Sequence, residues 1–274
     1  MNKIVVIANA RFEKGLIAFI NSYIKTNMES QLVIIDTGLQ NRYPYDTIKK
    51  EFNVKGLKKA EWMSDYSPYL QLELGDIDAD KIIYLEADML LLNNIDYLFK
   101  KIAGDNFIAV MDDAAYTICN SWNKINIDSA GRYFISGSEL SNKYKYYKGY
   151  NGGLIGASIE SYRGLQSIYN YYLQDEKQYR LLAQSLLNQY FIEEGIVVND
   201  VGLENNLSGI NEYYDYPQLY DIIFYNNKYR VKFNGFDINV LHFTGKNKPF
   251  FNNDINIMRS VWDYYYNNGR LFNV

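Results

Sequence analysis

The chain has 274 residues, of which 48% are hydrophobic and 22% are charged, and its formal net charge is −4. These values are typical of a folded domain with one hydrophobic core, and the acidic pI near 5.2 argues against nucleic acid as the main partner. A single cysteine excludes an internal disulfide framework. No apolar stretch is long enough to span a bilayer or to form a signal segment, so we expect a cytoplasmic protein.

The first half of the chain alternates strands and helices. Short β-branched runs predict buried strands at residues 4–8 and 31–36, and the apolar spacing between them predicts a helix over 13–27. A strand, a helix and a strand in this order indicate a parallel sheet. The further elements expected in this half are a helix over 67–77 and strands over 81–88 and 106–113.

The second half begins with a segment, 114–148, in which no period holds. Such a long irregular segment inside a compact domain is typical of a functional loop or a lid. The pattern then resumes with a strand opened by glycines at 149–158. The other expected elements are helices over 161–174 and 178–194, strands over 196–200 and 238–243, and an amphipathic C-terminal helix over 254–268.

Two carboxylates, Glu86 and Asp88, follow the buried strand that begins at Lys81. Residues two apart on a strand point to the same face, and open α/β sheets bind ligands at the carboxyl ends of their strands. Two acids in such a place repel each other unless a cation lies between them. Oxygen ligands suit Mg²⁺ or Mn²⁺, and a diphosphate could complete the shell. The alternative is a pair of solvated acids that end a strand.

The only histidine, His242, leaves an apolar strand and is followed by Gly245, Lys248 and Pro249. A glycine lets the backbone approach a ligand closely, and Lys248 offers a point charge for a phosphate. An imidazole nitrogen beside carboxylate oxygens shifts the preference from Mg²⁺ toward Mn²⁺. The alternative interpretation is a half-buried histidine that bonds to the backbone.

Four short segments share one order along the chain. They are Tyr84-Leu-Glu-Ala-Asp88, Tyr150-Asn-Gly-Gly153, Ala183-Gln-Ser-x-x-Asn188 and His242-Phe-Thr-Gly-x-x-Lys-Pro-Phe250. In order and spacing they resemble the motifs of glycosyltransferase family 8, which are YLDAD, F-N-x-G, DQD-x-x-N and HFxGxxKPW. This glycogenin-like group also includes bacterial lipopolysaccharide glycosyltransferases. The last motif is the most specific, and the resemblance covers almost the whole chain.

The resemblance implies a GT-A fold: a single α/β domain with a mostly parallel, Rossmann-like sheet flanked by helices and a C-terminal helical element. It implies retaining transfer of a hexose, glucose or galactose, from a UDP-sugar to a glycan, lipid-linked or protein acceptor, with Mn²⁺ (or Mg²⁺) as cofactor. Residues 1–113 would form the nucleotide-binding half, 114–148 the loop or lid, 149–250 the donor-sugar and acceptor half, and 251–274 the C-terminal helix. The sequence leaves the oligomeric state open, and a homodimer is one of the possible states.

The resemblance also assigns roles to individual residues. The implied metal ligands are Glu86, Asp88 and His242. The implied nucleotide and diphosphate contacts are Ala8, Asn9, Ala10, Phe12, Ala87, Gly245 and Lys248. The implied donor-sugar contacts are Asn151, Gly152, Gly153 and Gln184, and Gln184, near the anomeric carbon, is the expected catalytic residue.

The chain departs from the family pattern at several positions. Glu86 replaces an aspartate, and its longer arm leaves metal binding plausible with altered denticity. Ala183 and Ser185 replace the two acids that flank the family's glutamine, which affects the donor sugar and the rate. Phe250 replaces a tryptophan, and the arginine often found before the metal strand is missing near Tyr69.

Two other functions follow from these departures and from the shared sheet. The missing acids favour a nucleotide-sugar-binding protein of the same fold with little or no transferase activity. A metal-dependent nucleotidyltransferase would share the sheet and the carboxylates. It would also show a glycine-rich phosphate loop after the first strand, and the "NARFEKG" found there is not one.

Overall fold

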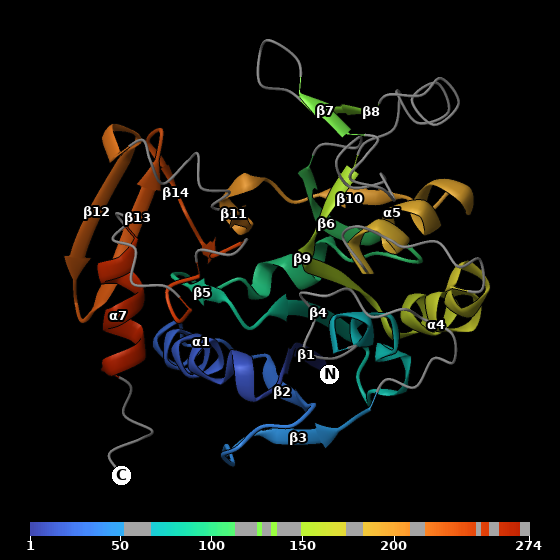
Figure 1. The fold of residues 1–274 in the computed structure, drawn as a ribbon, viewed down its shortest axis with the longest axis horizontal. Helices are drawn as coiled ribbons and strands as arrows, with labels where there is room; N and C mark the ends of the chain where they lie inside the picture. Colours follow the sequence, from blue (N-terminus) through green and yellow to red (C-terminus); the bar gives the residue numbers. More distant parts are fainter. Residues whose placement is uncertain are drawn as a thin grey trace. The chain divides into compact units, whose positions relative to one another are not determined.

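The structure is a computed structural model of the chain. It describes residues 1–51, 67–112, 125–127, 133–135, 149–173, 183–208, 217–244, 248–251 and 258–268. Within these residues the chain is mixed α/β, with a central sheet flanked by helices (Figure 1). The expected α/β class is therefore confirmed. No helix in the described part is long and apolar enough to cross a membrane.

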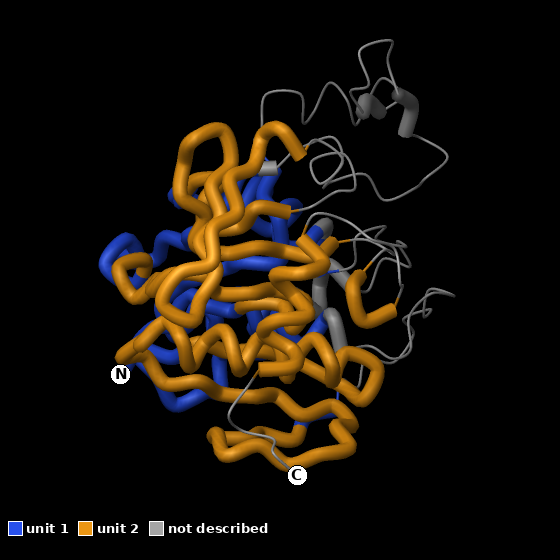
Figure 2. The backbone as a smooth tube through the Cα atoms, turned by 90° about the vertical axis from the view of Figure 1, so that its left-hand side faces the viewer, with its two compact units in different colours: residues 1–3, 50–84, 99–201 blue, residues 4–49, 85–98, 202–274 orange. Residues whose placement is uncertain are grey.

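The chain divides into two compact units, each assembled from separate stretches of sequence (Figure 2). Unit 1 comprises residues 1–3, 50–84 and 99–201, and unit 2 comprises residues 4–49, 85–98 and 202–274. The functional subdivision expected at residues 113, 148 and 250 stays a prediction.

Unit 1 contains the strand order β10-β6-β9-β4 of the central sheet. These strands are β4 (Lys81–Glu86, whose last two residues belong to unit 2), β6 (Phe107–Asp112), β9 (Gly149–Ser158) and β10 (Val198–Asp200). β10 pairs with β6 in parallel, whereas β6 and β9 run antiparallel. Inside the segment expected to be irregular, β7 (Ile125–Ile127) and β8 (Tyr133–Ile135) pair with each other. The rest of 114–148 lies outside the described residues.

The helices of unit 1 confirm two predictions and correct a third. α4 (Ile159–Leu173) and α5 (Ala183–Glu193) lie where helices were expected. The helix predicted over 67–77 is wrong in type, because the structure has two 3₁₀ segments there, η2 (Ser67–Leu72) and η3 (Leu74–Asp76). Leu70, Leu72 and Leu74 are all fully buried, and one stripe of an α-helix cannot bury three residues spaced by two.

Unit 2 contains the strand order β1-β2-β3. The elements that build this part are β1 (Asn2–Ala8, whose first two residues belong to unit 1), η1 (Ala10–Phe12), α1 (Glu13–Lys25), β2 (Gln31–Asp36) and β3 (Asp46–Lys49). The predicted strand–helix–strand order is confirmed. In α1, Leu16, Phe19 and Ile20 are fully buried, whereas Ile24 is 40% exposed.

Two smaller sheets complete unit 2. One has the order β11 (Leu207–Ser208), β15 (Val240–His242), β5 (Met89–Leu91), and the other has the order β12 (Tyr220–Tyr225), β13 (Lys228–Phe233), β14 (Phe236–Asp237). The remaining elements are η4 (Asp96–Lys101, shared between the units), η6 (Leu203–Asn205), η7 (Pro217–Leu219) and α7 (Arg259–Asn267). One apolar cluster, which includes Leu90, Leu241 and Trp262, joins both sheets to α1 and α7.

Candidate functional site

Strand pairing in unit 2 brings two distant segments of sequence to one place. β4 ends at Glu86, and a short turn that includes Asp88 leads into β5. β5 pairs antiparallel with β15, which places Met89 opposite His242. The backbone N–H of Phe243 donates to the carbonyl of Asp88 at 3.0 Å. The two carboxylates and the single histidine therefore share one site.

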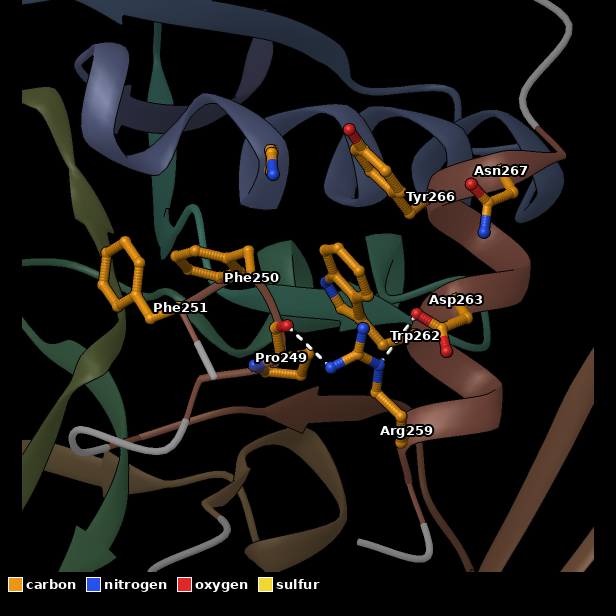
Figure 3. A pocket seen from close by; sticks show the side chains of 9 residues that line it. Pro249, Phe250, Phe251, Arg259, Trp262, Asp263, Tyr266 and Asn267 are labelled. Carbon is orange, nitrogen blue, oxygen red and sulfur yellow. Dashed lines mark hydrogen bonds and ion pairs between the residues drawn. The ribbon is translucent and has the colours of Figure 1, made fainter. Parts of the chain in front are cut away.

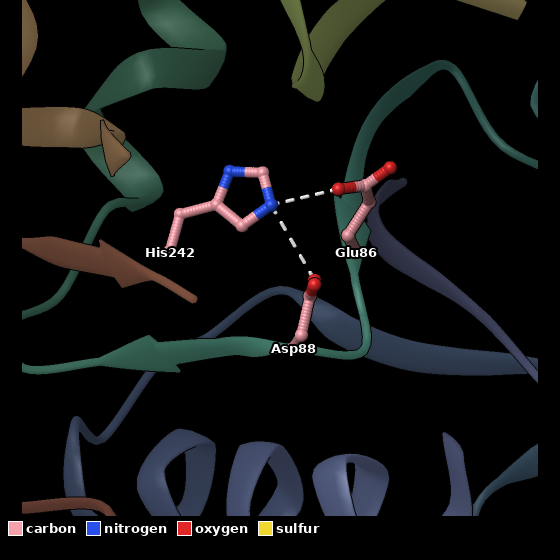
Figure 4. Close-up of side chains that lie close together, drawn as sticks. All are labelled: Glu86, Asp88 and His242. Carbon is pink, nitrogen blue, oxygen red and sulfur yellow. Dashed lines mark ion pairs between the residues drawn. The ribbon is translucent and has the colours of Figure 1, made fainter. Parts of the chain in front are cut away.

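The three side chains of this site point toward one another (Figure 4). Nε2 of His242 lies 2.7 Å from Oε2 of Glu86 and 3.4 Å from Oδ1 of Asp88. Each residue offers one ligand atom, and the three atoms lie within 4.8 Å of one another. Asp88 and His242 are almost fully buried, whereas the side chain of Glu86 is 37% exposed. The longer arm of Glu86 therefore reaches the same point as the shorter arm of Asp88.

This donor set fits a divalent cation. Two carboxylate oxygens suit Mg²⁺ or Mn²⁺, and one imidazole nitrogen favours Mn²⁺. The second ring nitrogen of His242, Nδ1, lies 2.9 Å from Oδ1 of Asn206, so Nε2 is the nitrogen that faces the carboxylates. Within the described residues, no other group of three His, Cys, Asp or Glu side chains has ligand atoms this close together.

The charges in this cluster depend on one another. Burial opposes a charge on Asp88, but Lys248 and His242 hold the pKa of that carboxyl well below its usual range. Burial likewise opposes a charge on His242, yet the carboxylates of Asp88 and Glu86 raise the pKa of the imidazole to about 9. A cation that binds here takes the place of the proton on Nε2, because both need the same lone pair.

Lys248 contacts the other oxygen of Asp88. Its ammonium forms an ion pair with Oδ2 of that residue and donates to the carbonyl of Phe243 at 3.1 Å. The same nitrogen lies 5.7 Å from the ring centroid of Phe12. The site therefore combines a carboxylate–histidine cluster with a positive charge held beside it, which is an arrangement suited to a metal-bound diphosphate.

Helix α1 packs directly against the turn that carries the carboxylates. Gly15 has no side chain, and a Cβ placed there would lie 2.6 Å from the carbonyl oxygen of Ala87 and 2.9 Å from Cε1 of Phe250. Only glycine therefore fits this approach without movement of the turn. Ala87, one of the expected nucleotide contacts, has its carbonyl oxygen against this helix.

The end of β1, where the nucleotide was expected, is fixed by the loop after β2. The carbonyl of Ala8 accepts hydrogen bonds from the N–H and the hydroxyl of Thr37, at 3.0 and 3.1 Å. The N–H of Ala10 donates to the carbonyl of Gly38 at 3.0 Å. Oδ1 of Asn9 accepts from two backbone N–H groups of η1, at 3.0 and 3.2 Å. Asn9 thus serves as an N-cap.

Phe12 joins the first strand's end to the last motif. Its ring lies edge-on to Phe250 and Phe251, with centroid distances of 5.7 and 5.4 Å. The guanidinium of Arg11 lies 4.9 Å from the ring centroid of Phe251. Phe12 is half-buried as a residue.

A cavity of about 390 Å³ lies between α7, residues 249–251 and the start of α1 (Figure 3). Arg259 contributes to its wall, and Nη1 of its guanidinium donates to the carbonyl of Pro249 at 2.9 Å. Its Nε donates to Oδ1 of Asp263 at 2.8 Å, and its guanidinium lies 5.6 Å from the ring centroid of Trp262. Arg259 thereby ties α7 to the segment that carries Lys248.

The expected donor-sugar residues lie together in unit 1, on β9 and at the start of α5. The N–H of Gly152 donates to Oε1 of Gln184 at 2.8 Å, and the N–H of Gly153 donates to Oδ1 of Asn151 at 2.8 Å. A Cβ on Gly152 would lie 3.0 Å from Cβ of Gln184, so a glycine allows the helix to pack closely on the strand. The side-chain carbonyl of Gln184 is therefore oriented by the strand backbone.

Asn188, which had no assigned role, joins the same two elements. Its Oδ1 accepts from the N–H of Tyr150 at 2.7 Å, and its Nδ2 donates to the carbonyls of Tyr150 and Gln184, at 2.8 Å each. The side chain is 1% exposed, so these bonds satisfy a buried amide. An asparagine inside an otherwise apolar helical stretch was the signal in the sequence. Ala183, at the position of one missing acid, is fully buried.

Two expected positions cannot be placed on this site. Gly245 lies outside the described residues, and so does the side chain of Ser185.

A mixed α/β fold with a carboxylate–histidine cluster at the end of a sheet strand is typical of GT-A-type glycosyltransferases. The sequence matches the family model described as Glycosyl transferase family 8 over residues 3–254. The chain therefore belongs to glycosyltransferase family 8. A search of curated proteins finds no match for it.

Solved structures share the fold at low sequence identity. The galactosyltransferase LgtC, in complex with donor and acceptor sugar analogues, is 14% identical with a TM-score of 0.65, over 98% of this chain and 97% of that one. GlyE from Streptococcus pneumoniae is 14% identical with a TM-score of 0.60, over 97% and 60%. Mouse xyloside xylosyltransferase 1 is 12% identical with a TM-score of 0.54, over 91% and 99%. The expected GT-A-type fold is thus confirmed.

Proposed function

We propose that this family 8 chain transfers a hexose, glucose or galactose, from a UDP-sugar to a glycan, lipid-linked or protein acceptor, with retention of the anomeric configuration. The observation that carries the proposal is the cluster of Glu86, Asp88 and His242 with Lys248 at its side. The description of the structural neighbour LgtC names a galactosyltransferase with a donor and an acceptor sugar, which supports this class of reaction.

The cluster would hold Mn²⁺, with Mg²⁺ as the alternative ion. When bound, the ion supplies positive charge to the departing diphosphate. Lys248 adds a second positive charge from the protein, and Gly245 would let the backbone approach the phosphates. Negative charge builds on the β-phosphate as its bond to the sugar breaks. A positive charge fixed beside it stabilises the transition state more than the ground state.

The transfer step needs no nucleophile from the protein. The acceptor oxygen forms a bond to the anomeric carbon while the bond from that carbon to the β-phosphate oxygen breaks on the same face. The acceptor's proton passes to the leaving phosphate oxygen. Gln184 would stabilise the positive anomeric carbon through its carbonyl dipole, with sugar contacts from Asn151, Gly152 and Gly153. The nucleotide would lie against Ala8, Asn9, Ala10, Phe12 and Ala87.

A donor screen tests this function. The protein is incubated with UDP-glucose, UDP-galactose or UDP-GlcNAc, with and without Mn²⁺, and UDP release is measured. We expect Mn²⁺-dependent release from at least one donor, lost in Asp88→Asn and His242→Ala with unchanged circular dichroism. Asp221→Asn, an exposed carboxylate on β12, is the control that should behave as wild type. No release from any nucleotide sugar would refute the enzymatic proposal, and unchanged Mn²⁺ affinity in both site variants would refute the chosen ligands.

A second function, binding of a nucleotide sugar without efficient transfer, is favoured by one observation. Ala183 is fully buried at a position where the family has an acid, so no carboxylate can act from there. Calorimetry that detects UDP binding without release of UDP from any donor would favour this second function over the first.

A further inference from the structure

Asn206 contacts the imidazole of His242 on the side of the ring that faces away from the carboxylates. Oδ1 of Asn206 lies 2.9 Å from Nδ1 of the ring, and the two residues are 1% and 2% exposed. Nδ1 points away from Glu86 and Asp88, whereas Nε2 points toward them (Figure 4). Because water is excluded from this contact, the hydrogen bond acts strongly on the orientation of the ring.

This hydrogen bond decides which ring nitrogen keeps its hydrogen. An amide oxygen can only accept, so Nδ1 of His242 must donate. A neutral imidazole carries one hydrogen, and with that hydrogen on Nδ1 the lone pair lies on Nε2. We propose that Asn206 is a positioning residue, which fixes His242 so that Nε2 is turned to a divalent cation between the carboxylates. This inference rests on the metal site of the proposed function.

The segment that presents Asn206 is itself fixed. β11 begins at the next residue and pairs in parallel with β15, which places Ser208 opposite His242. One residue earlier, Asn205 is fully buried, and its Oδ1 accepts from the hydroxyl of Tyr97 at 2.7 Å. Asn206 therefore lies between two anchored positions and offers a stationary acceptor. Ligand side chains held in this way bind metal ions with less loss of conformational entropy.

Variants of Asn206 test the inference with Mn²⁺ alone as the probe, measured by calorimetry. Asn206→Ala removes the acceptor, and we expect it to weaken Mn²⁺ binding about 10- to 100-fold. Asn206→Asp keeps an acceptor oxygen at the same place and should restore most of the affinity. The matched control is Asn93→Ala, which loses side-chain bonds to Ile238 and Asn239 in the same unit without touching the cluster. Its Mn²⁺ affinity should equal that of wild type.

A spectroscopic measurement separates positioning from general support of the fold. His242 is the only histidine, so every imidazole signal in a nitrogen NMR spectrum belongs to it. We expect an Nδ1–H signal that exchanges slowly with water in the wild type, both alone and with Mg²⁺, because Nδ1 keeps its hydrogen in either case. Asn206→Ala should lose this slow exchange, and Asn206→Asp should retain it. A purely structural asparagine would lower stability without moving this signal.

The outcomes distinguish this inference from the proposed function. A wild-type protein without Mn²⁺ affinity would refute the metal site and the inference together. Two results would refute the inference alone. One is an Mn²⁺ affinity of Asn206→Ala equal to that of wild type. The other is an Mn²⁺ affinity of Asn206→Asp as weak as that of Asn206→Ala. If Asn206→Ala does not fold, the wild-type spectrum decides: a hydrogen on Nδ1 of the Mg²⁺-bound ring supports the inference, and one on Nε2 overturns it.

Discussion

Replacement of Gly15 by alanine tests how the proposed metal site depends on helix α1. The new Cβ would lie 2.6 Å from the carbonyl oxygen of Ala87, whereas ordinary contact begins at 3.4 Å. The helix and the turn must therefore move apart by about 0.8 Å. The obstacle is backbone, which cannot rotate away as a side chain can. Overpacking of this kind costs about 1–3 kcal/mol, and the helical preference of alanine over glycine returns about 1 kcal/mol. We therefore expect a net loss of roughly 0–2 kcal/mol.

The larger effect of Gly15→Ala should fall on metal binding. Ala87 lies between the proposed ligands Glu86 and Asp88, so a shift of its carbonyl should move both carboxylates. Metal–ligand distances are tolerant to only about 0.2 Å, so we expect Mn²⁺ affinity to fall about tenfold or more. Urea unfolding measures the loss of stability, and calorimetry with Mn²⁺ measures the loss of metal affinity.

Gly164→Ala is the matched control, because it makes the same chemical change within helix α4. A Cβ there would meet only the hydroxyl of Tyr190, at 4.0 Å. We expect this variant to gain up to about 1 kcal/mol and to keep the Mn²⁺ affinity of wild type. If Gly15→Ala gave the same gain in stability and the same affinity as Gly164→Ala, the argument from close packing would be wrong.

Three further predictions concern the support of the site and of the core. Glu13→Ala should lower the free energy of unfolding by about 2–4 kcal/mol, because Oε1 of the buried Glu13 accepts hydrogen bonds from Asn41 and Tyr43. Urea unfolding measures this change, and a loss under about 0.5 kcal/mol would contradict the reasoning. Arg259→Met should weaken UDP binding about fivefold and leave Mn²⁺ affinity unchanged, since Arg259 holds the segment that carries Lys248, the proposed diphosphate contact. Equal UDP affinity by calorimetry would refute that role. Burial raises the pKa of Tyr162 above its ordinary value of 10, so its contribution to stability is complete below pH 10 and is lost as the pH rises further. Between pH 9 and 11 the Tyr162→Phe variant should therefore lose about 1.4 kcal/mol less than wild type in urea unfolding, and an equal loss would show that Tyr162 ionises in the folded state.

Local patterns in the sequence predict much of the fold. The strand over 31–36 and the strand over 149–158 agree with β2 and β9 residue for residue, because apolar and glycine-rich runs bounded by polar residues mark buried strands. The hairpin of β12 and β13 was missed, although Asn226 and Asn227 between them adopt positive φ angles of 50° and 58°, as a two-residue hairpin turn requires. β3 was missed as well, since its exposed polar residues give no apolar pattern.

In the candidate site, residues in local motifs were predicted, whereas residues that act through long-range contacts were missed. The resemblance to the family 8 motifs predicted that Glu86, Asp88 and His242 belong together, because each of those motifs lies in one short stretch that can be read from the sequence. Asn206 and Gly15 could not be found in this way. An asparagine in a polar stretch and a glycine in a helix have no pattern of their own, and their roles appear only when a second segment packs against them. Contacts of this kind depend on tertiary structure and are not encoded in any one stretch of sequence.

The three candidate ligands differ in how firmly the fold holds them. Asp88 and His242 are buried. His242 pairs with Met89 in the ladder between β5 and β15, and the carbonyl of Asp88 accepts a hydrogen bond from the N–H of Phe243. Glu86 ends its strand with a partly exposed side chain and one more rotatable bond than aspartate. The protein therefore offers two ligands in fixed positions and a third that can adjust its reach. If Glu86 is a ligand, as proposed, the family's aspartate can be replaced by glutamate here because the lengthened arm belongs to the candidate ligand with room to move.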